Sequence, residues 1–186
     1  MIGGQEEGEI IPCLLGVKLR SDLRWVENTD YICKRGYARL WMLRRLKALG
    51  AKQTELVDLY EKQVRSLLEL AVPVWHPGLT KIQTRDIERV QKISFRIILG
   101  PKYSSYKEAC QYLCAETLEE RRQKLCLKFA QKNLKSEHSL FKKLTPSVRT
   151  RNHSNLVQEY KCRTNRYQKS SLPYLAKLLN NHQKTK

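Results

Sequence analysis

Apolar side chains recur every three or four residues through most of the chain, which is the period of helices with one buried face. The clearest case lies between residues 54 and 72, where the apolar positions follow that period closely. We therefore predict a mainly α fold with about five helices. Their expected ranges are 29–49, 54–72, 80–99, 105–114 and 117–135.

Residues that favour helix ends support these boundaries. Thr80 and Thr117 are each followed three residues later by Gln or Glu, which is the spacing of a capping box. Thr29 is the expected N-cap of the first helix, and Gly50 is its expected stop. Pro73 is expected to end the second helix, because a proline inside a helix removes a hydrogen bond.

Both ends of the chain depart from the helical pattern. Residues 8–19, "GEIIPCLLGVKL", predict one or two short β-strands near residues 14–19. Residues 142–171 are basic and rich in Asn, Ser and Thr, which predicts a flexible linker, and a short apolar helix follows the turn at Pro173. We expect an acidic N-terminus with the β segment at 1–27, a helical domain at 28–140, and a basic linker and tail at 141–186.

The charge of the chain indicates which kind of partner it binds. Lys and Arg number 36 against 18 Asp and Glu, which gives a net charge of +18, and residues 141–186 alone contribute +10. Such an excess points to a polyanionic partner, so we expect weak, electrostatic binding of RNA or DNA.

The sequence also predicts a compartment. No apolar run approaches the roughly 18 residues of a membrane span, and the acidic N-terminus lacks the features of a signal peptide. Six scattered cysteines fit a reducing compartment better than a disulfide framework. We expect an intracellular protein, cytoplasmic or nuclear, with no membrane partner.

Two of the predicted helices carry one-signed rows of bases beside their apolar faces. A row of bases along a helix can follow a phosphate backbone, although it can also be a solvated face that keeps the protein soluble. The third predicted helix carries Arg85, Arg89, Lys92 and Arg96, and the fifth carries Arg121, Lys124, Lys128, Lys132 and Lys135.

The first predicted helix and the tail add further candidate contacts. Aromatic rings among bases suit nucleic acids through stacking or cation–π contacts, and the alternative is that Tyr37 and Trp41 pack against a neighbouring helix. The bases in question are Arg44 and Arg45 in the helix, and Arg163, Arg166 and Lys169 in the tail.

Residues for independent catalysis or metal binding are not apparent. Cys110 and Cys114 share a helical face, but four zinc ligands in a usable array are lacking. We expect buried thiols, no cofactor and no metal, and a His76 that packs at the end of the second helix.

Motifs along the chain give a more specific interpretation. They are "LLGVKLRSDLRW" (14–25) with "LRRLK" (43–47), "LELAVPVWH" (68–76) with "IERVQK" (87–92), "TLEERR" (117–122), and "RTNRYQKSSLPYL" (163–175). In the same order, they resemble the region after the catalytic palm in reverse transcriptases of non-LTR (LINE-like) retrotransposons. Leu14 replaces the family's usual aromatic residue, and Asn28 stands near its usual histidine.

The resemblance implies a palm-end strand, a thumb that holds the template–primer duplex, and a C-terminal extension. The family's aromatic-x-Asp-Asp motif would lie N-terminal to this chain, which contains no Asp-Asp pair. Since two-metal phosphoryl transfer needs those carboxylates, we expect no polymerase activity.

We interpret the chain as a C-terminal fragment of such an RNA-directed DNA polymerase, lacking the palm and retaining at most template–primer binding. Two alternatives stay open. One is an autonomous basic nucleic-acid-binding module. The other is a helical interaction protein whose exposed apolar faces met the palm of an intact reverse transcriptase.

Overall fold

Helices make up most of the computed structural model, which describes residues 12–134 and 155–184. A small antiparallel sheet precedes them, with β1 (Cys13–Leu14) paired to β2 (Val17–Lys18) so that Leu14 lies opposite Val17. The structure therefore confirms the predicted mainly α fold with a short N-terminal β segment.

The helices follow in chain order. They are α1 (Val26–Ala48), α2 (Gln53–Leu59), the π-helix η1 (Tyr60–Arg65), α3 (Ser66–Leu68), α4 (Val72–Trp75), the 3-10 turn η2 (His76–Gly78), α5 (Lys81–Leu99), the 3-10 turn η3 (Gly100–Lys102), α6 (Tyr106–Tyr112), α7 (Leu118–Asn133), α8 (Asn165–Gln168) and α9 (Ser171–Lys184).

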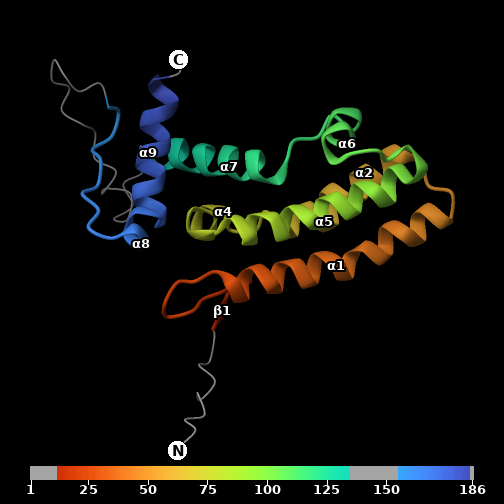
Figure 1. Ribbon diagram of the computed structural model, residues 1–186, viewed down its shortest axis with the longest axis horizontal. Helices are drawn as coiled ribbons and strands as arrows, with labels where there is room; N and C mark the ends of the chain where they lie inside the picture. Colours follow the sequence, from red (N-terminus) through yellow and green to blue (C-terminus); the bar gives the residue numbers. More distant parts are fainter. Residues whose placement is uncertain (1–11, 135–154, 185–186) are drawn as a thin grey trace, which may run out of the picture.

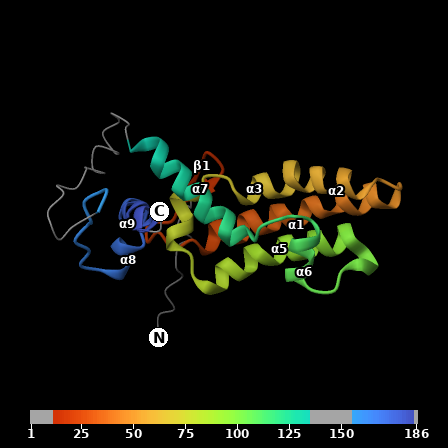
Figure 2. The ribbon, with the colours of Figure 1, turned by 90° about the horizontal axis from the view of Figure 1, so that it is seen from above.

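The long helices run along one axis of an elongated body (Figure 1). Helices α1 and α5 lie side by side and parallel, and the continuous segment α2–η1–α3 runs back alongside them in the opposite direction (Figure 2). Helix α7 runs back along this layer, and α9 stands across its end against α7 and α4. Gly36 permits the close approach of α1 to α5, because a Cβ there would lie 3.0 Å from Val90 Cγ1.

The predicted starts of α5 and α7 are confirmed by their capping boxes. The Gln83 amide donates to Thr80 Oγ1 (3.2 Å) and the Thr80 amide to Gln83 Oε1 (2.7 Å). The Glu120 amide likewise donates to Thr117 Oγ1 (3.2 Å), and the Thr117 amide to Glu120 Oε2 (3.1 Å). The sequence predicts these two helix starts correctly because each capping box involves only residues that are three positions apart.

The predicted start of the first helix is wrong by one turn. Helix α1 begins at Val26, and Thr29 is a buried residue of its first turn instead of the N-cap. The Thr29 hydroxyl donates to the Trp25 carbonyl (2.7 Å), four residues earlier. Trp25 is buried, which holds the backbone in place just before α1. The helix can therefore begin at Val26, before Thr29, although Thr29 is the residue that favours an N-cap position.

The second predicted helix is interrupted in the structure. A π-helical turn replaces α-helix at 60–65, and the helix ends before Ala71, which adopts a left-handed conformation (φ 51°). Pro73 does not end a helix, since it lies in the first turn of the new helix α4, where its missing N–H is not needed. Pro173 occupies the same kind of position in α9, which begins at Ser171.

The tail is more ordered than its composition predicts. Residues 142–154 of the expected linker lie outside the described residues, and part of the remainder, Leu156, Val157 and Tyr160, packs against the core. Val157 is fully buried, and its N–H and C=O both bond to the Asn180 side chain at 3.0 Å. This pairing holds the segment before α8 against α9, which itself packs on α7.

Candidate nucleic-acid interface

The basic stripe of α5 lies on the surface, as its spacing predicts. Ile87, Val90 and Ile98 are buried on the opposite side of the helix, which fixes the bases toward solvent. Arg85, Arg89 and Arg96 are exposed, and Lys92 is half-buried.

Two tyrosines lie beside this stripe. The Arg96 guanidinium sits over the Tyr103 ring, 5.2 Å from its centroid, and Lys92 Nζ lies 5.0 Å from the centroid of Tyr106. Tyr103 reaches Arg96 because the chain turns sharply at Gly100 (φ 57°) and the Tyr103 amide bonds back to the Gly100 carbonyl (3.1 Å). The bases of α5 therefore face solvent with an aromatic ring at one end of their row.

A hollow of about 480 Å³ lies along the stripe, and we call it the α5 hollow. It is lined by the four bases together with Ile93 and Tyr103, and by one acid, Asp86. Within the described chain, Arg85 and Arg89 have no ion-pair partner, so their charges are available to a bound anion.

The stripe of α7 is different, because two of its members pair with acids. Arg121 binds Glu69 of the adjoining chain segment through two hydrogen bonds, one of them 3.0 Å from Nη2 to Oε2. The bond to Glu69 raises the pKa of Arg121, despite the opposing effect of burial. Lys124 pairs with Glu116, which lies before the helix and whose pKa this bond lowers.

The rest of the α7 stripe is divided between exposed and undescribed positions. Lys128 and Lys132 are exposed, and Lys135 lies outside the described residues. A separate hollow of about 430 Å³ lies here and shares no lining residue with the α5 hollow, and Glu61 and Glu116 contribute to its wall. The structure therefore does not bring the two stripes into one cavity.

The first-helix candidates also divide. Arg44 and Arg45 are exposed, and Trp41 is 62% exposed, so this ring does not pack into a neighbouring helix. Tyr37 is half-buried against the core, as the alternative interpretation predicted. Burial raises the pKa of Tyr37, and the charges of Arg89 and Asp86 also act on it, which places this tyrosine beside the α5 stripe.

The candidate bases of the tail surround α8. Arg163, Arg166 and Lys169 are all exposed, and Thr164 caps the helix by accepting from the Tyr167 amide (3.2 Å). Arg166 and Lys169 border an apolar groove of about 690 Å³ whose other wall includes Leu23 and Val26 of the N-terminal segment.

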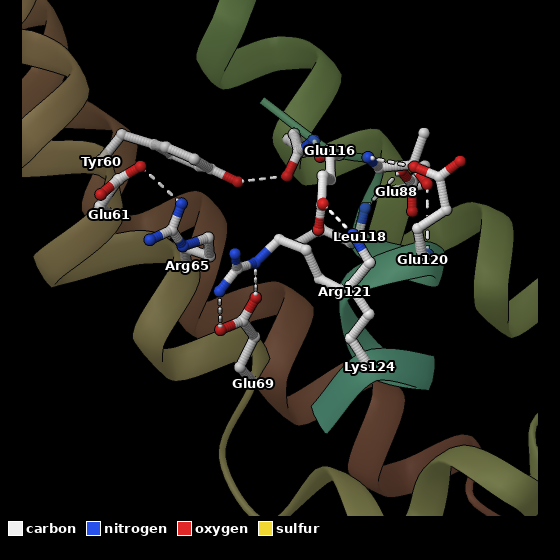
Figure 3. A network of polar contacts seen from close by, with 12 residues as sticks. Tyr60, Glu61, Arg65, Glu69, Glu88, Glu116, Leu118, Glu120, Arg121 and Lys124 are labelled. Atoms are coloured by element: carbon white, nitrogen blue, oxygen red, sulfur yellow. Dashed lines mark hydrogen bonds and ion pairs between the residues drawn. The ribbon is translucent and has the colours of Figure 1, made fainter. Parts of the chain in front are cut away.

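The sequence interpretation missed a buried polar network behind these surfaces (Figure 3). Gln91 accepts from the Tyr60 hydroxyl (2.5 Å) and donates to the Tyr106 hydroxyl and the Glu116 carbonyl, both at 2.9 Å. Tyr106 in turn donates to Glu88, whose Oε1 also accepts from the Leu118 amide (2.9 Å).

Glu88 follows Arg85 of the basic stripe by three residues on α5, yet its side chain is buried between helices. A single clue in the sequence favours this arrangement, which is that Glu88 and Gln91 border the apolar face three residues apart. Only the tertiary fold identifies the Leu118 amide, an otherwise unpaired group at the start of α7, as the partner.

A second buried group surrounds His76, which packs at the end of its segment as expected. Arg122 is 0% exposed, and its Nε donates to His76 Nδ1 (3.3 Å), while the Tyr174 hydroxyl lies 3.4 Å from His76 Nε2. Burial and the nearby Arg122 charge lower the pKa of His76 to about 4. Burial lowers the pKa of Arg122 too, opposed by the charge of Glu88.

The expectation of buried thiols holds for Cys110 and Cys126 but is wrong for Cys114, which is exposed because it lies beyond the end of α6 in a left-handed conformation (φ 50°). Burial raises the pKa of Cys126 and Cys33 to about 12. In the described ranges, no three His, Cys, Asp or Glu side chains lie close enough together to hold a metal ion.

No helix within residues 12–134 or 155–184 combines the length and the apolarity needed to cross a membrane. Comparison with protein-family models, with curated proteins and with solved structures gives no match to this chain.

Proposed function

We propose that this chain binds RNA or DNA through its exposed bases, in the role of the thumb and C-terminal region of a non-LTR reverse transcriptase. The observation that carries the proposal is the α5 stripe, in which exposed arginines border a hollow and lack ion-pair partners among the described residues. Paired bases such as Arg121 are better explained as links between chain segments.

The dimensions of the stripe suit a polynucleotide strand. Arg85 and Arg96 are eleven residues apart, which is roughly 16 Å along an α-helix. At about 3.4 Å of rise per nucleotide, this length matches several phosphates of one strand. Since the contacts involve charges and not base edges, binding is expected to depend little on sequence.

The polar contacts support assigning the motif residues to one folded module. Residues from the motifs at 68–76, 87–92 and 117–122 contact one another: Glu69 pairs with Arg121, Glu88 with the Leu118 amide, and His76 with Arg122. The proposed role has no polymerase step, and it is carried out in the cytoplasm or nucleus.

The experiment is a salt titration of binding. Fluorescence anisotropy with a labelled RNA–DNA duplex gives the slope of log K against log salt, which is about −0.7 to −0.9 per phosphate contacted. The variant replaces Arg85, Arg89, Lys92 and Arg96 by Gln, which is a good helix former. With one phosphate for each of the four bases, we expect the slope to become shallower by about 3.

A matched control removes the same charge elsewhere. Its substitutions to Gln are at the exposed residues Lys52, Lys107, Lys177 and Lys184, none of which lines the α5 hollow. Equal slopes for the two variants would show that only net charge matters. An unchanged slope in a folded α5 variant would assign the stripe to solvation.

A second candidate function is docking onto the palm of an intact reverse transcriptase. The observation that favours it is the apolar surface around the sheet, where Leu15 is 89% exposed and Leu14, Leu23 and Val26 are also exposed. A Leu15→Glu, Leu23→Glu variant is expected to lose co-purification with a recombinant palm domain while retaining nucleic-acid binding. Retained co-purification would exclude this surface.

A further inference from the structure

The α5 hollow has properties that a simple phosphate track does not need. Its volume of about 480 Å³ falls within the roughly 300–1,000 Å³ typical of pockets for small organic ligands. The outer surface of a duplex presents phosphates and keeps its bases stacked inside. Such a surface would reach the arginines at the rim but would leave the interior of the hollow empty.

Tyr103 and Arg96 line one end of the hollow with an aromatic ring and a guanidinium group. Tyr103 is half-buried, and the guanidinium of Arg96 lies over its ring, 5.2 Å from the centroid. Ile93, one turn before Arg96, supplies an apolar wall. Aromatic rings and guanidinium planes are the groups on which proteins stack unpaired bases.

The charges in the hollow are unevenly placed. Arg85 and Arg89 lie toward the other end and have no ion-pair partner among the described residues, so each can take a phosphate. Asp86 also lines the hollow, and its carboxylate repels phosphate but accepts N–H donors from a base edge. Phosphates are therefore favoured at the arginines but disfavoured beside Asp86 inside the hollow, where the base of a strand that turns one nucleotide inward fits.

We propose that the α5 hollow holds an unpaired nucleotide of a single strand, with its base stacked on the Arg96–Tyr103 pair and its flanking phosphates on Arg85 and Arg89. The inference rests on the proposed nucleic-acid binding and adds a substrate class to it. A duplex would contact the same arginines but not Tyr103. Substitution of Tyr103 should therefore weaken binding of a single strand and not binding of a duplex.

The test compares three labelled probes: a 12-nucleotide oligouridine, a 12-base-pair duplex, and a 12-unit strand of abasic nucleotides. Tyr103→Leu is expected to weaken oligouridine binding about tenfold, equivalent to about 1.4 kcal/mol, and duplex binding less than twofold. Tyr103→Phe keeps the ring and is expected to bind like the unsubstituted protein. Tyr112→Leu, at an exposed tyrosine of α6 outside the hollow, is the matched control.

The abasic strand provides a measurement that does not need a variant. The unsubstituted protein is expected to bind it about tenfold more weakly than oligouridine, and Tyr103→Leu is expected to remove that difference. Equal binding of the two strands, or equal losses on duplex and single strand in Tyr103→Leu, would overturn the nucleotide site. A shallower salt slope in the four-Gln variant would then leave the proposed function standing, whereas no binding of any probe would overturn both.

Discussion

Replacing Glu88 tests whether the buried polar network holds α5 to α7. The Glu88 carboxylate is buried and accepts both the Tyr106 hydroxyl and the Leu118 amide, the latter at 2.9 Å. Hydrogen bonds to charged groups contribute about 1.5–3 kcal/mol each. Glu88→Ala removes two of them and one of the charges that oppose the desolvation of Arg122. We expect the free energy of unfolding to fall by about 3–5 kcal/mol.

Two companion variants separate charge from hydrogen bonding. Glu88→Gln keeps an acceptor for the Leu118 amide but removes the charge, so we expect a smaller loss of about 1–2 kcal/mol. Asp86→Ala removes an acid from the same helix, two residues away, at a half-exposed position. It is expected to change stability by less than about 0.5 kcal/mol.

Urea unfolding followed by circular dichroism measures these differences. With a urea dependence of about 2 kcal/mol per molar, a loss of 4 kcal/mol lowers the midpoint by about 2 M. The urea midpoint is therefore expected to fall least in Asp86→Ala, more in Glu88→Gln and most in Glu88→Ala. If Glu88→Ala shifts the midpoint no more than Asp86→Ala, the carboxylate does not link the two helices, and the argument from its contacts is refuted.

Three further predictions concern the core. Gly36→Ala is expected to cost about 1–3 kcal/mol in a thermal or urea melt, because the new Cβ would lie 3.0 Å from Val90 Cγ1. The pKa of His76 is about 4, below its unfolded value of about 6.5, so the neutral buried imidazole contributes its whole stabilisation above pH 6.5. The free energy of unfolding therefore falls by up to about 3 kcal/mol as the pH drops toward 4. His76→Gln should flatten this part of the pH profile. Asn180→Ala leaves the buried N–H and C=O of Val157 unpaired, so we expect trypsin to cleave the tail faster than in the unsubstituted protein. An unchanged cleavage rate would mean that this pairing does not hold the tail.

The features that could be predicted from sequence are those set by neighbouring residues. The Thr80 and Thr117 caps each involve a partner three residues away. The outward direction of Arg85 and Arg89 follows from the apolar residues that share their helix. Local period and local chemistry suffice in these cases, since no distant part of the chain competes for the same groups.

Distant contacts explain what sequence reasoning missed. Arg121 appears as one member of a basic row, yet its partner Glu69 lies 52 residues earlier. Val157 lies in a segment whose composition predicts disorder, yet Asn180 satisfies its backbone. Pro73 is read as a helix end, although the left-handed Ala71 before it had already ended the helix. Each error comes from a partner or a backbone angle that the local pattern does not contain.

The motifs hold two kinds of residue, because buried groups such as Glu88 and Gln91 share the motif at 87–92 with the hollow-lining bases Arg89 and Lys92. Glu69, Glu88 and Gln91 of the motifs point into the protein and connect its helices, whereas Arg85 and Tyr103 lie outside the motifs and line the α5 hollow. Substitutions in the first set should therefore change the urea midpoint in proportion to any loss of binding. Substitutions in the second should weaken binding at an unchanged midpoint. A variant of Tyr103 that lost stability and binding together would place this ring in the first group and remove the distinction.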